Sequence, residues 1–174
     1  MTAFKNFILL TTLLTTLFLM HPSCAVADNE TQYPITTITK NINIRVAYEV
    51  KDDDWEAGVG KALYYVRGLL ESYKSMGVSP DKLHVSVVIH GPPAYWLLND
   101  AAIQKRSDDP FDYNSNVQIV HELITHGVSV EMCNSTMKGK GWTEKDLLPG
   151  VTIVHDAYTR LIDLQQRGYA YIRF

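Results

Sequence analysis

Short apolar segments alternate with amphipathic segments from residue 42 to the C-terminus. Five of the apolar segments are rich in valine and isoleucine and have the length of β-strands; they are residues 42–50, 83–90, 128–132, 151–154 and 169–172. The segments between them are long enough to cross over a sheet, and such connections normally join parallel strands. The sequence therefore predicts an α/β domain with three layers: a mostly parallel five-stranded sheet with helices on both faces.

Apolar periodicity and capping residues predict the intervening helices. The longest helix is expected over residues 55–76, where apolar residues recur every three or four positions and Gly77 can end the helix. Ser115 and Gln118 fit a capping box that would open a helix ending near His126. The other helices or single turns are expected over residues 94–104, 134–139, 143–148 and 156–167, with a polar loop at 105–114.

The first 27 residues have the features of a secretory signal peptide. Lys5 provides a short positive region, residues 7–20 are apolar or threonine, and residues 25–27 (AVA) form a cleavage site. The apolar stretch is shorter than the roughly 20 residues that a membrane-spanning helix needs. We expect cleavage after Ala27, a periplasmic or secreted protein, and no membrane span in the mature chain.

Cleavage would leave a polar, threonine-rich arm at residues 28–41, followed by one α/β domain at residues 42–174. The chain is 46% hydrophobic and 20% charged, which is typical of a globular protein. Its formal net charge of −3 gives no general attraction to nucleic acid or to anionic lipid. Cleavage would also remove Cys24, so Cys133 would be an unpaired cysteine in an oxidising compartment.

Cys133 follows directly after a predicted strand. Functional groups of parallel sheets gather beyond the carboxyl ends of the strands, and Asn134 and Ser135 can begin a helix there. Free N–H groups and the helix dipole would favour the thiolate, which is the nucleophilic form of cysteine. The same position also suits a buried cysteine that packs as a small hydrophobic residue. The position alone leaves both interpretations open.

Polar residues also stand at the other strand ends. His90 could orient a ligand or donate a proton beside Cys133, or it could only stabilise the turn at Gly91. Residues 52–54 (DDD) could bind a cation, although consecutive carboxylates usually form a solvated turn. Together with His155, His90 and Cys133 could hold zinc, but they lack the close ligand spacing of known zinc sites. We therefore expect no metal.

Three stretches of the sequence resemble one family. Residues 126–133 (HGVSVEMC) resemble the segment of the DsrE/DsrF-like sulfur-relay family in which H-G-V, four residues and a cysteine follow one another. Residues 90–92 (HGP), together with the tail segments 147–151 (LLPGV) and 168–172 (GYAYI), resemble the exported, single-domain branch of that family. The resemblance extends over residues 42–174.

The resemblance implies a DsrEFH-like or flavodoxin-like fold, a homotrimer or homohexamer, and sulfur transfer through Cys133. The protein would then be an exported persulfide carrier with sulfurtransferase-like chemistry, and its partners would be sulfur-donating and sulfur-accepting thiols or proteins. Cys133 would be the catalytic residue, and His90, Gly91, Asn134 and Ser135 would bind the ligand. This chemistry requires no metal, nucleotide or other cofactor.

Two further interpretations of the sequence remain open. One is an oligomeric binding or scaffold module that keeps the fold and performs no covalent chemistry. The other is a thiol-based redox or metal-sensing protein. The three interpretations differ in the role of Cys133, because a sulfur carrier needs a thiol that solvent can reach and that backbone N–H groups face.

Overall fold

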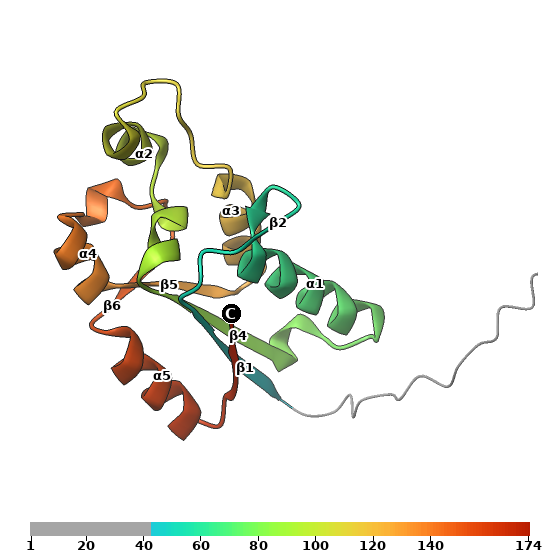
Figure 1. Cartoon of the computed structure of the whole chain (residues 1–174). Helices are drawn as coiled ribbons and strands as arrows, with labels where there is room; N and C mark the ends of the chain where they lie inside the picture. Colours follow the sequence, from blue (N-terminus) through green and yellow to red (C-terminus); the bar gives the residue numbers. More distant parts are fainter. Residues whose placement is uncertain (1–42) are drawn as a thin grey trace, which may run out of the picture. The chain divides into compact units, whose positions relative to one another are not determined.

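The computed structural model describes residues 43–174, so the predicted signal peptide (1–27) and arm (28–41) lie outside the described residues. Five strands form one sheet in the order β6-β5-β4-β1-β7 (Figure 1). They are β1 (Ile44–Val50), β4 (Leu83–Ile89), β5 (Ser129–Cys133), β6 (Thr152–Val154) and β7 (Ala170–Arg173). All neighbouring strands of this sheet are parallel, including both edge strands.

Helices cover both faces of the sheet, which confirms the predicted fold class. Helices α1 (Lys61–Ser75) and α3 (Val117–Thr125) lie on one face, and α5 (Ala157–Gln166) lies on the other (Figure 1). The remaining helices are α2 (Asp100–Ser107), α4 (Asn134–Lys140) and the 3-10 turns η1 (Pro80–Lys82), η2 (Pro92–Leu97) and η3 (Glu144–Asp146).

The central strands are buried on both faces, which explains why most of their residues are apolar. Alternate side chains enter a large cluster with α1 and α3, and the intervening ones enter a smaller cluster with α5. The smaller cluster consists of Ala47, Val88, Cys133, Ala157, Leu161 and Leu164. The strands that contribute to it also carry buried polar side chains, namely Glu49, Ser86, His90 and Glu131. The face of the sheet that packs against α5 is therefore the one that carries buried polar side chains.

The predicted helix over residues 55–76 begins too early. Residues 55–60 instead form an antiparallel hairpin of β2 (Trp55–Glu56) and β3 (Val59–Gly60), with positive φ at Ala57 and Gly58. The backbone N–H of Gly60 donates to Oδ1 of Asn116 (2.7 Å), a contact that ties the hairpin to the start of α3. Gly77 has a φ of +76° and follows the end of α1, as predicted.

Two other helix starts also differ from the prediction. The helix expected over 94–104 is divided into η2 and α2, because the side chain of Asn99 accepts a hydrogen bond from Ala102 N–H and starts a new helix. The N-cap of α3 is Asn116 rather than Ser115, and its side chain makes no capping bond because it accepts from Gly60. The predicted caps at Thr143 and Asp156 are confirmed.

Candidate functional site

Cys133 is the last residue of β5 and the N-cap residue of α4, as the sequence predicts. Its exposure differs from the expectation. The residue is only 3% exposed and packs in the small cluster with Ala157 and Leu161 of α5. Its sulfur makes no capping hydrogen bond to the first turn of α4. The expectation of an open thiol is therefore wrong for the described chain, because α5 covers the sulfur.

His90 lies next to Cys133 in the sheet. In the pairing of β4 with β5, Ile89 is opposite Met132, so the residues that follow stand on neighbouring strands. Neighbouring strands are about 4.8 Å apart. Side chains alternate between the two faces of a strand, so His90 and Cys133 both lie on the face toward α5. The backbone N–H of His90 donates to Val50 O (3.0 Å) and extends the ladder between β4 and β1 by one residue. The fold thus brings together these two predicted site residues.

The ring of His90 is held by a buried carboxylate. Its Nε2 atom lies 2.9 Å from Oε1 of Glu49, and the hydroxyl of Tyr171 donates to Oε2 of the same carboxylate. His90 is 9% exposed and Glu49 is 6% exposed. Glu49 lies in β1, Tyr171 lies in β7 and His90 directly follows β4, so the network crosses three consecutive strands of the sheet.

The network fixes the charge of Glu49 and Tyr171. Burial acts to raise the pKa of Glu49, but hydrogen bonds from Tyr171 and His90 outweigh it and hold that pKa below its usual value. Burial, together with the hydrogen bond to Glu49, raises the pKa of Tyr171 to about 12. At neutral pH, Glu49 is therefore an anion that accepts hydrogen bonds, and Tyr171 keeps its proton and donates one.

Gly91, Asn134 and Ser135 lie where β4 and β5 give way to the following turns. The backbone N–H of Gly91 donates to Oγ1 of Thr136 (3.1 Å), which joins the end of β4 to the first turn of α4. Gly91 has a φ of +67°, a conformation that favours glycine. Asn134 is half-buried and Ser135 is exposed. The turn at Gly91 is thus held by Thr136, and His90 is free for its contact with Glu49.

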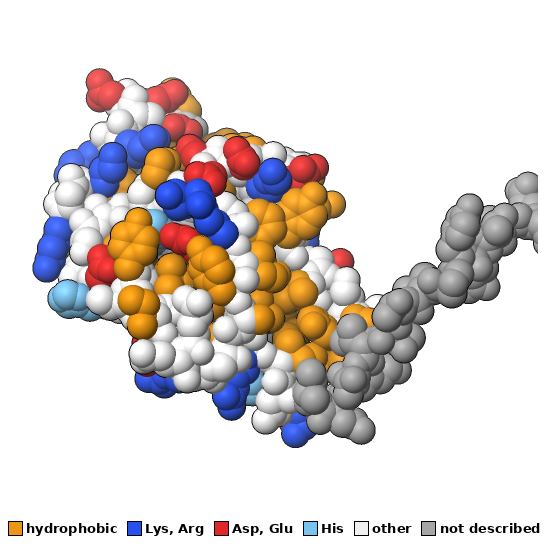
Figure 2. Space-filling model, turned by 60° about the horizontal axis from the view of Figure 1, so that its bottom comes forward, with side chains coloured by type: hydrophobic (Ala, Val, Ile, Leu, Met, Phe, Trp, Pro, Cys, Tyr) orange, Lys and Arg blue, Asp and Glu red, His pale blue; other side chains and the backbone are white. Residues whose placement is uncertain are grey.

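The first turn of α5 lies against both Cys133 and His90. Ala157 packs in the cluster of Cys133, and the ring of Tyr158 meets the His90 ring edge-on with centroids 5.3 Å apart. Tyr158 itself is 59% exposed, and Ile162, Tyr171 and Ile153 are also exposed. In Figure 2 the α5 side of the molecule comes forward, and hydrophobic side chains surround a small group of acidic and basic ones.

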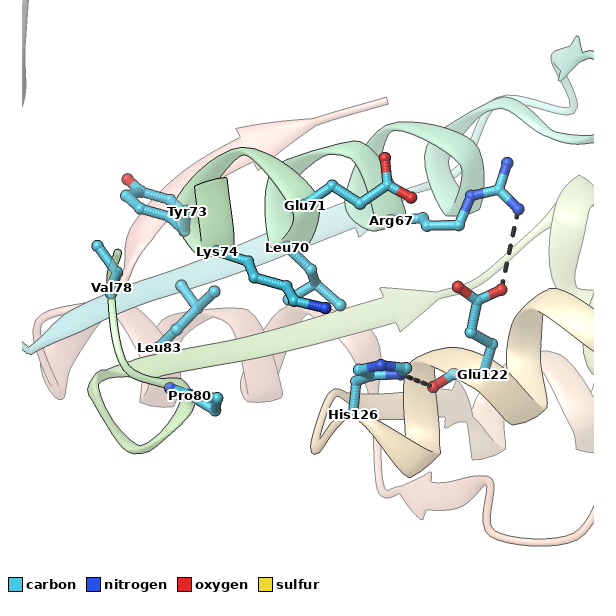
Figure 3. Close-up of a pocket in the computed structure, with 10 residues that line it drawn as sticks. All are labelled: Arg67, Leu70, Glu71, Tyr73, Lys74, Val78, Pro80, Leu83, Glu122 and His126. Carbon is cyan, nitrogen blue, oxygen red and sulfur yellow. Dashed lines mark hydrogen bonds and ion pairs between the residues drawn. The ribbon is translucent and has the colours of Figure 1, made fainter. Parts of the chain in front are cut away.

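Two cavities lie at the opposite end of the sheet from Cys133. One, of about 430 Å³, lies between the ends of α1 and α3, with Leu70, Val78 and Leu83 in its wall and Lys74 and His126 reaching toward it (Figure 3). The other, of about 480 Å³, is lined by Arg45, His84, Arg167 and Tyr169. Both are near the amino ends of the strands. Neither is lined by a predicted site residue.

The remaining strand-end residues have structural contacts or are exposed. Asp53 accepts hydrogen bonds from Tyr95 and from Trp96, and Asp54 pairs with Lys61 at 3.3 Å. His155 is exposed. Among residues 43–174, His, Cys, Asp and Glu side chains form no group of three or more that could hold a metal ion.

The family model that describes the DsrE/DsrF-like family matches residues 60–174. The chain belongs to the DsrE/DsrF-like family. The matched region includes His90, Cys133 and Tyr171 and begins after Glu49. The resemblance seen in the sequence is thereby confirmed at the level of the family.

Solved structures with the same fold include two similar proteins. Protein MTH1491 of Methanobacterium thermoautotrophicum, whose function is unknown, is 26% identical with a TM-score of 0.59, and the alignment covers 75% of this chain and 99% of that one. The ychN protein of E. coli is 15% identical with a TM-score of 0.50, and the alignment covers 75% of this chain and 100% of that one. The search of curated proteins found no match. No helix within residues 43–174 has the length and hydrophobicity needed to cross a membrane.

Proposed function

We propose that this DsrE/DsrF-like protein carries sulfur as a persulfide on Cys133. The observation that supports the proposal is the position of the thiol. Cys133 ends a central parallel strand, starts α4 and stands beside His90, within the region that matches the family model. Membership of this family suggests a sulfur-relay role, and Cys133 is the free cysteine of the described residues.

The proposed reaction is an exchange between sulfur atoms. The Cys133 thiolate attacks the terminal sulfur of a donor persulfide, the sulfur–sulfur bond of the donor breaks, and the donor leaves as a thiolate. The product is a persulfide on Cys133. Attack by an acceptor thiolate on its terminal sulfur then passes that atom on and regenerates Cys133. The exchange conserves electrons, so it needs no oxidant, metal or other cofactor.

Burial of Cys133 requires that the covering residues move for each transfer. The first turn of α5 lies over the site, with Ala157 against Cys133 and Tyr158 against His90. Displacement of this turn would expose the sulfur to a donor. Its return would protect the persulfide from small thiols between transfers. The first turn of α5 therefore moves away from Cys133 when a donor or acceptor binds.

The cellular setting and the assembly are also proposals. The features of residues 1–27 support export, so the donor and acceptor would be outside the cytoplasm. Exposed apolar side chains on α5 and β7, among them Tyr158, Ile162 and Ile172, would suit contacts between copies in a trimer or hexamer.

Mass spectrometry of the intact protein tests the sulfur carrier directly. A Cys24→Ser background removes the other cysteine, and the matched variant adds Cys133→Ser. After incubation with inorganic polysulfide, we expect the background protein to gain the mass of sulfur atoms that a reductant then removes. The variant with Cys133→Ser should gain none. Equal mass gains for the two proteins, or no gain by the background protein, would contradict the proposal.

A scaffold without covalent chemistry is the second candidate function. It is favoured by the 3% exposure of Cys133 among aliphatic side chains, which is typical of an inert buried cysteine. The same experiment separates the two candidates when it is repeated in denaturant. A scaffold predicts a thiol that reacts only after unfolding, whereas a carrier reacts while α5 and the sheet remain folded.

A further inference from the structure

We infer that Glu49 and Tyr171 are positioning residues that prepare His90 to carry a proton during sulfur transfer at Cys133. The inference rests on the proposed function and adds two residues to it. Sequence analysis identified neither residue, and Glu49 lies outside the region matched by the family model. The case rests on the hydrogen-bond geometry, on the charge of Glu49 and on a contrast with the other buried carboxylate of the same sheet.

The hydrogen bonds define which nitrogen of His90 carries the hydrogen. Glu49 is ionised, so it only accepts, and the atom 2.9 Å from its Oε1 must be a donor. Nε2 of His90 therefore carries a hydrogen. Nδ1 of the neutral ring keeps its lone pair and can take up a proton. Tyr171 completes the arrangement, because its hydroxyl donates to the second oxygen of Glu49 and restrains the carboxylate.

Glu131 shows how this fold neutralises a buried carboxylate when no histidine is involved. Glu131 is 0% exposed, and its two oxygens bind Nε and Nη2 of Arg160 at 2.8 and 2.9 Å. Glu49, on the same face, has His90 in place of an arginine. An arginine holds a permanent charge, whereas a histidine gains and loses a proton near neutral pH. The negative charge of Glu49 is thus directed at a group that can change its charge.

The position of this network gives it a role at Cys133. His90 is the neighbour of Cys133 on the β4 side, and its ring extends into the layer between the sheet and α5. The charged or titratable groups that face the network are Cys133 from β5, Tyr158 from α5, and Tyr171 and Arg173 from β7. Tyr171 keeps its proton at neutral pH, because burial and the hydrogen bond to Glu49 raise its pKa to about 12. His90 is therefore the proton acceptor closest in the sheet to the thiol.

In the proposed step, His90 moves one proton. Nδ1 takes the proton of the Cys133 thiol as its sulfur attacks the donor, and Glu49 stabilises the resulting imidazolium. The ring then gives the proton to the donor sulfur that leaves. A thiol and a donor persulfide thus become a Cys133 persulfide and a donor thiol, with no net gain or loss of protons. No hydrogen bond joins the ring to the sulfur within the described residues, so the contact forms when a donor is bound.

Three substitutions in the Cys24→Ser background test this inference. They are Glu49→Gln, Tyr171→Phe and, as the matched control, Tyr169→Phe, whose ring packs beside the same cluster. The rate of sulfur uptake is measured with inorganic polysulfide, and nitrogen NMR of the labelled His90 ring reports which nitrogen carries the hydrogen. Because a general acid–base group contributes about 10²–10⁴-fold, we expect uptake to slow about tenfold or more in Glu49→Gln and by less in Tyr171→Phe. Tyr169→Phe should match the parent.

The NMR signature distinguishes positioning from a general loss of packing. In the parent, hydrogen should reside on Nε2, and this preference should weaken in both Glu49→Gln and Tyr171→Phe while the folded spectrum persists. If Glu49→Gln fails to fold, the partly exposed Tyr171→Phe still provides the test. If the folded variants take up sulfur as fast as the parent and the hydrogen of the His90 ring stays on Nε2, this inference is wrong and the proposed function still stands. Absence of uptake by the parent protein would overturn the proposed function and this inference with it.

Discussion

Replacement of Arg160 by leucine is expected to lower the free energy of unfolding by about 3–5 kcal/mol, since it leaves a buried charge without its partner. Arg160 binds both oxygens of Glu131, which is 0% exposed, and it also bonds Asp163 at 2.8 Å. The hydrogen bonds to Glu131 raise the pKa of Arg160, so the guanidinium remains charged. Urea unfolding of the Arg160→Leu variant measures the loss.

Two further variants show whether the buried pair is responsible. Arg167→Leu removes another arginine of the same segment that pairs with Asp163, but its side chain is 66% exposed. We expect that variant to lose less than about 1 kcal/mol, as is usual for exposed ion pairs. The double variant Glu131→Leu with Arg160→Leu should recover most of the stability, because it removes the buried carboxylate together with its partner. Equal losses in the Arg160→Leu and Arg167→Leu variants would contradict this account.

Truncation of Trp96 to alanine is expected to lower the free energy of unfolding by about 3–5 kcal/mol, the usual range for a large buried aromatic residue. Trp96 is 0% exposed and its Nε1 donates to Asp53 (2.9 Å). The backbone of Gly60 lies so close that an added Cβ would be 2.5 Å from the ring. Trp96 thus holds the hairpin and the start of α1 against η2, and the variant should show a lower urea midpoint.

Trp55 provides the matched control for Trp96. The two rings meet edge-on with centroids 5.8 Å apart, but Trp55 is 43% exposed. Trp55→Ala should therefore cost only about 1 kcal/mol, which is the value of an aromatic pair with limited burial. A Trp55→Ala variant as unstable as Trp96→Ala would show that the hairpin, and not the buried ring, determines stability.

Local patterns in the sequence were sufficient to predict the strands and several helix ends. Most residues of each central strand are apolar because both of its faces are buried, and this signal can be read without knowing which strands pair. Asp156 and Thr143 cap their helices through bonds to the next few residues, which are also local. The hairpin at residues 55–60 was missed because Val59 continues the apolar period of α1, while the contacts that hold the hairpin come from Asn116 and Trp96.

The site depends on tertiary contacts that local sequence patterns do not indicate. Glu49 and Tyr171 are 122 residues apart and meet only because β7 pairs with β1. The order of strands in a parallel sheet is a tertiary property, so neither residue could be assigned to the site beforehand. One signal was present, because Glu49 is a carboxylate between apolar residues at the end of a strand. The burial of Cys133 was equally unpredictable, since it depends on how α5 packs on the sheet.

Two-step transfer of isotopically labelled sulfur is the most direct test of the sulfur carrier. The folded Cys24→Ser protein is loaded with labelled polysulfide, freed of excess reagent, and then given a small acceptor thiol. Our account predicts that the label is found on the peptide containing Cys133 after the first step and on the acceptor after the second. Label that never reaches Cys133 in the folded protein, or that cannot leave it without unfolding, would contradict the account.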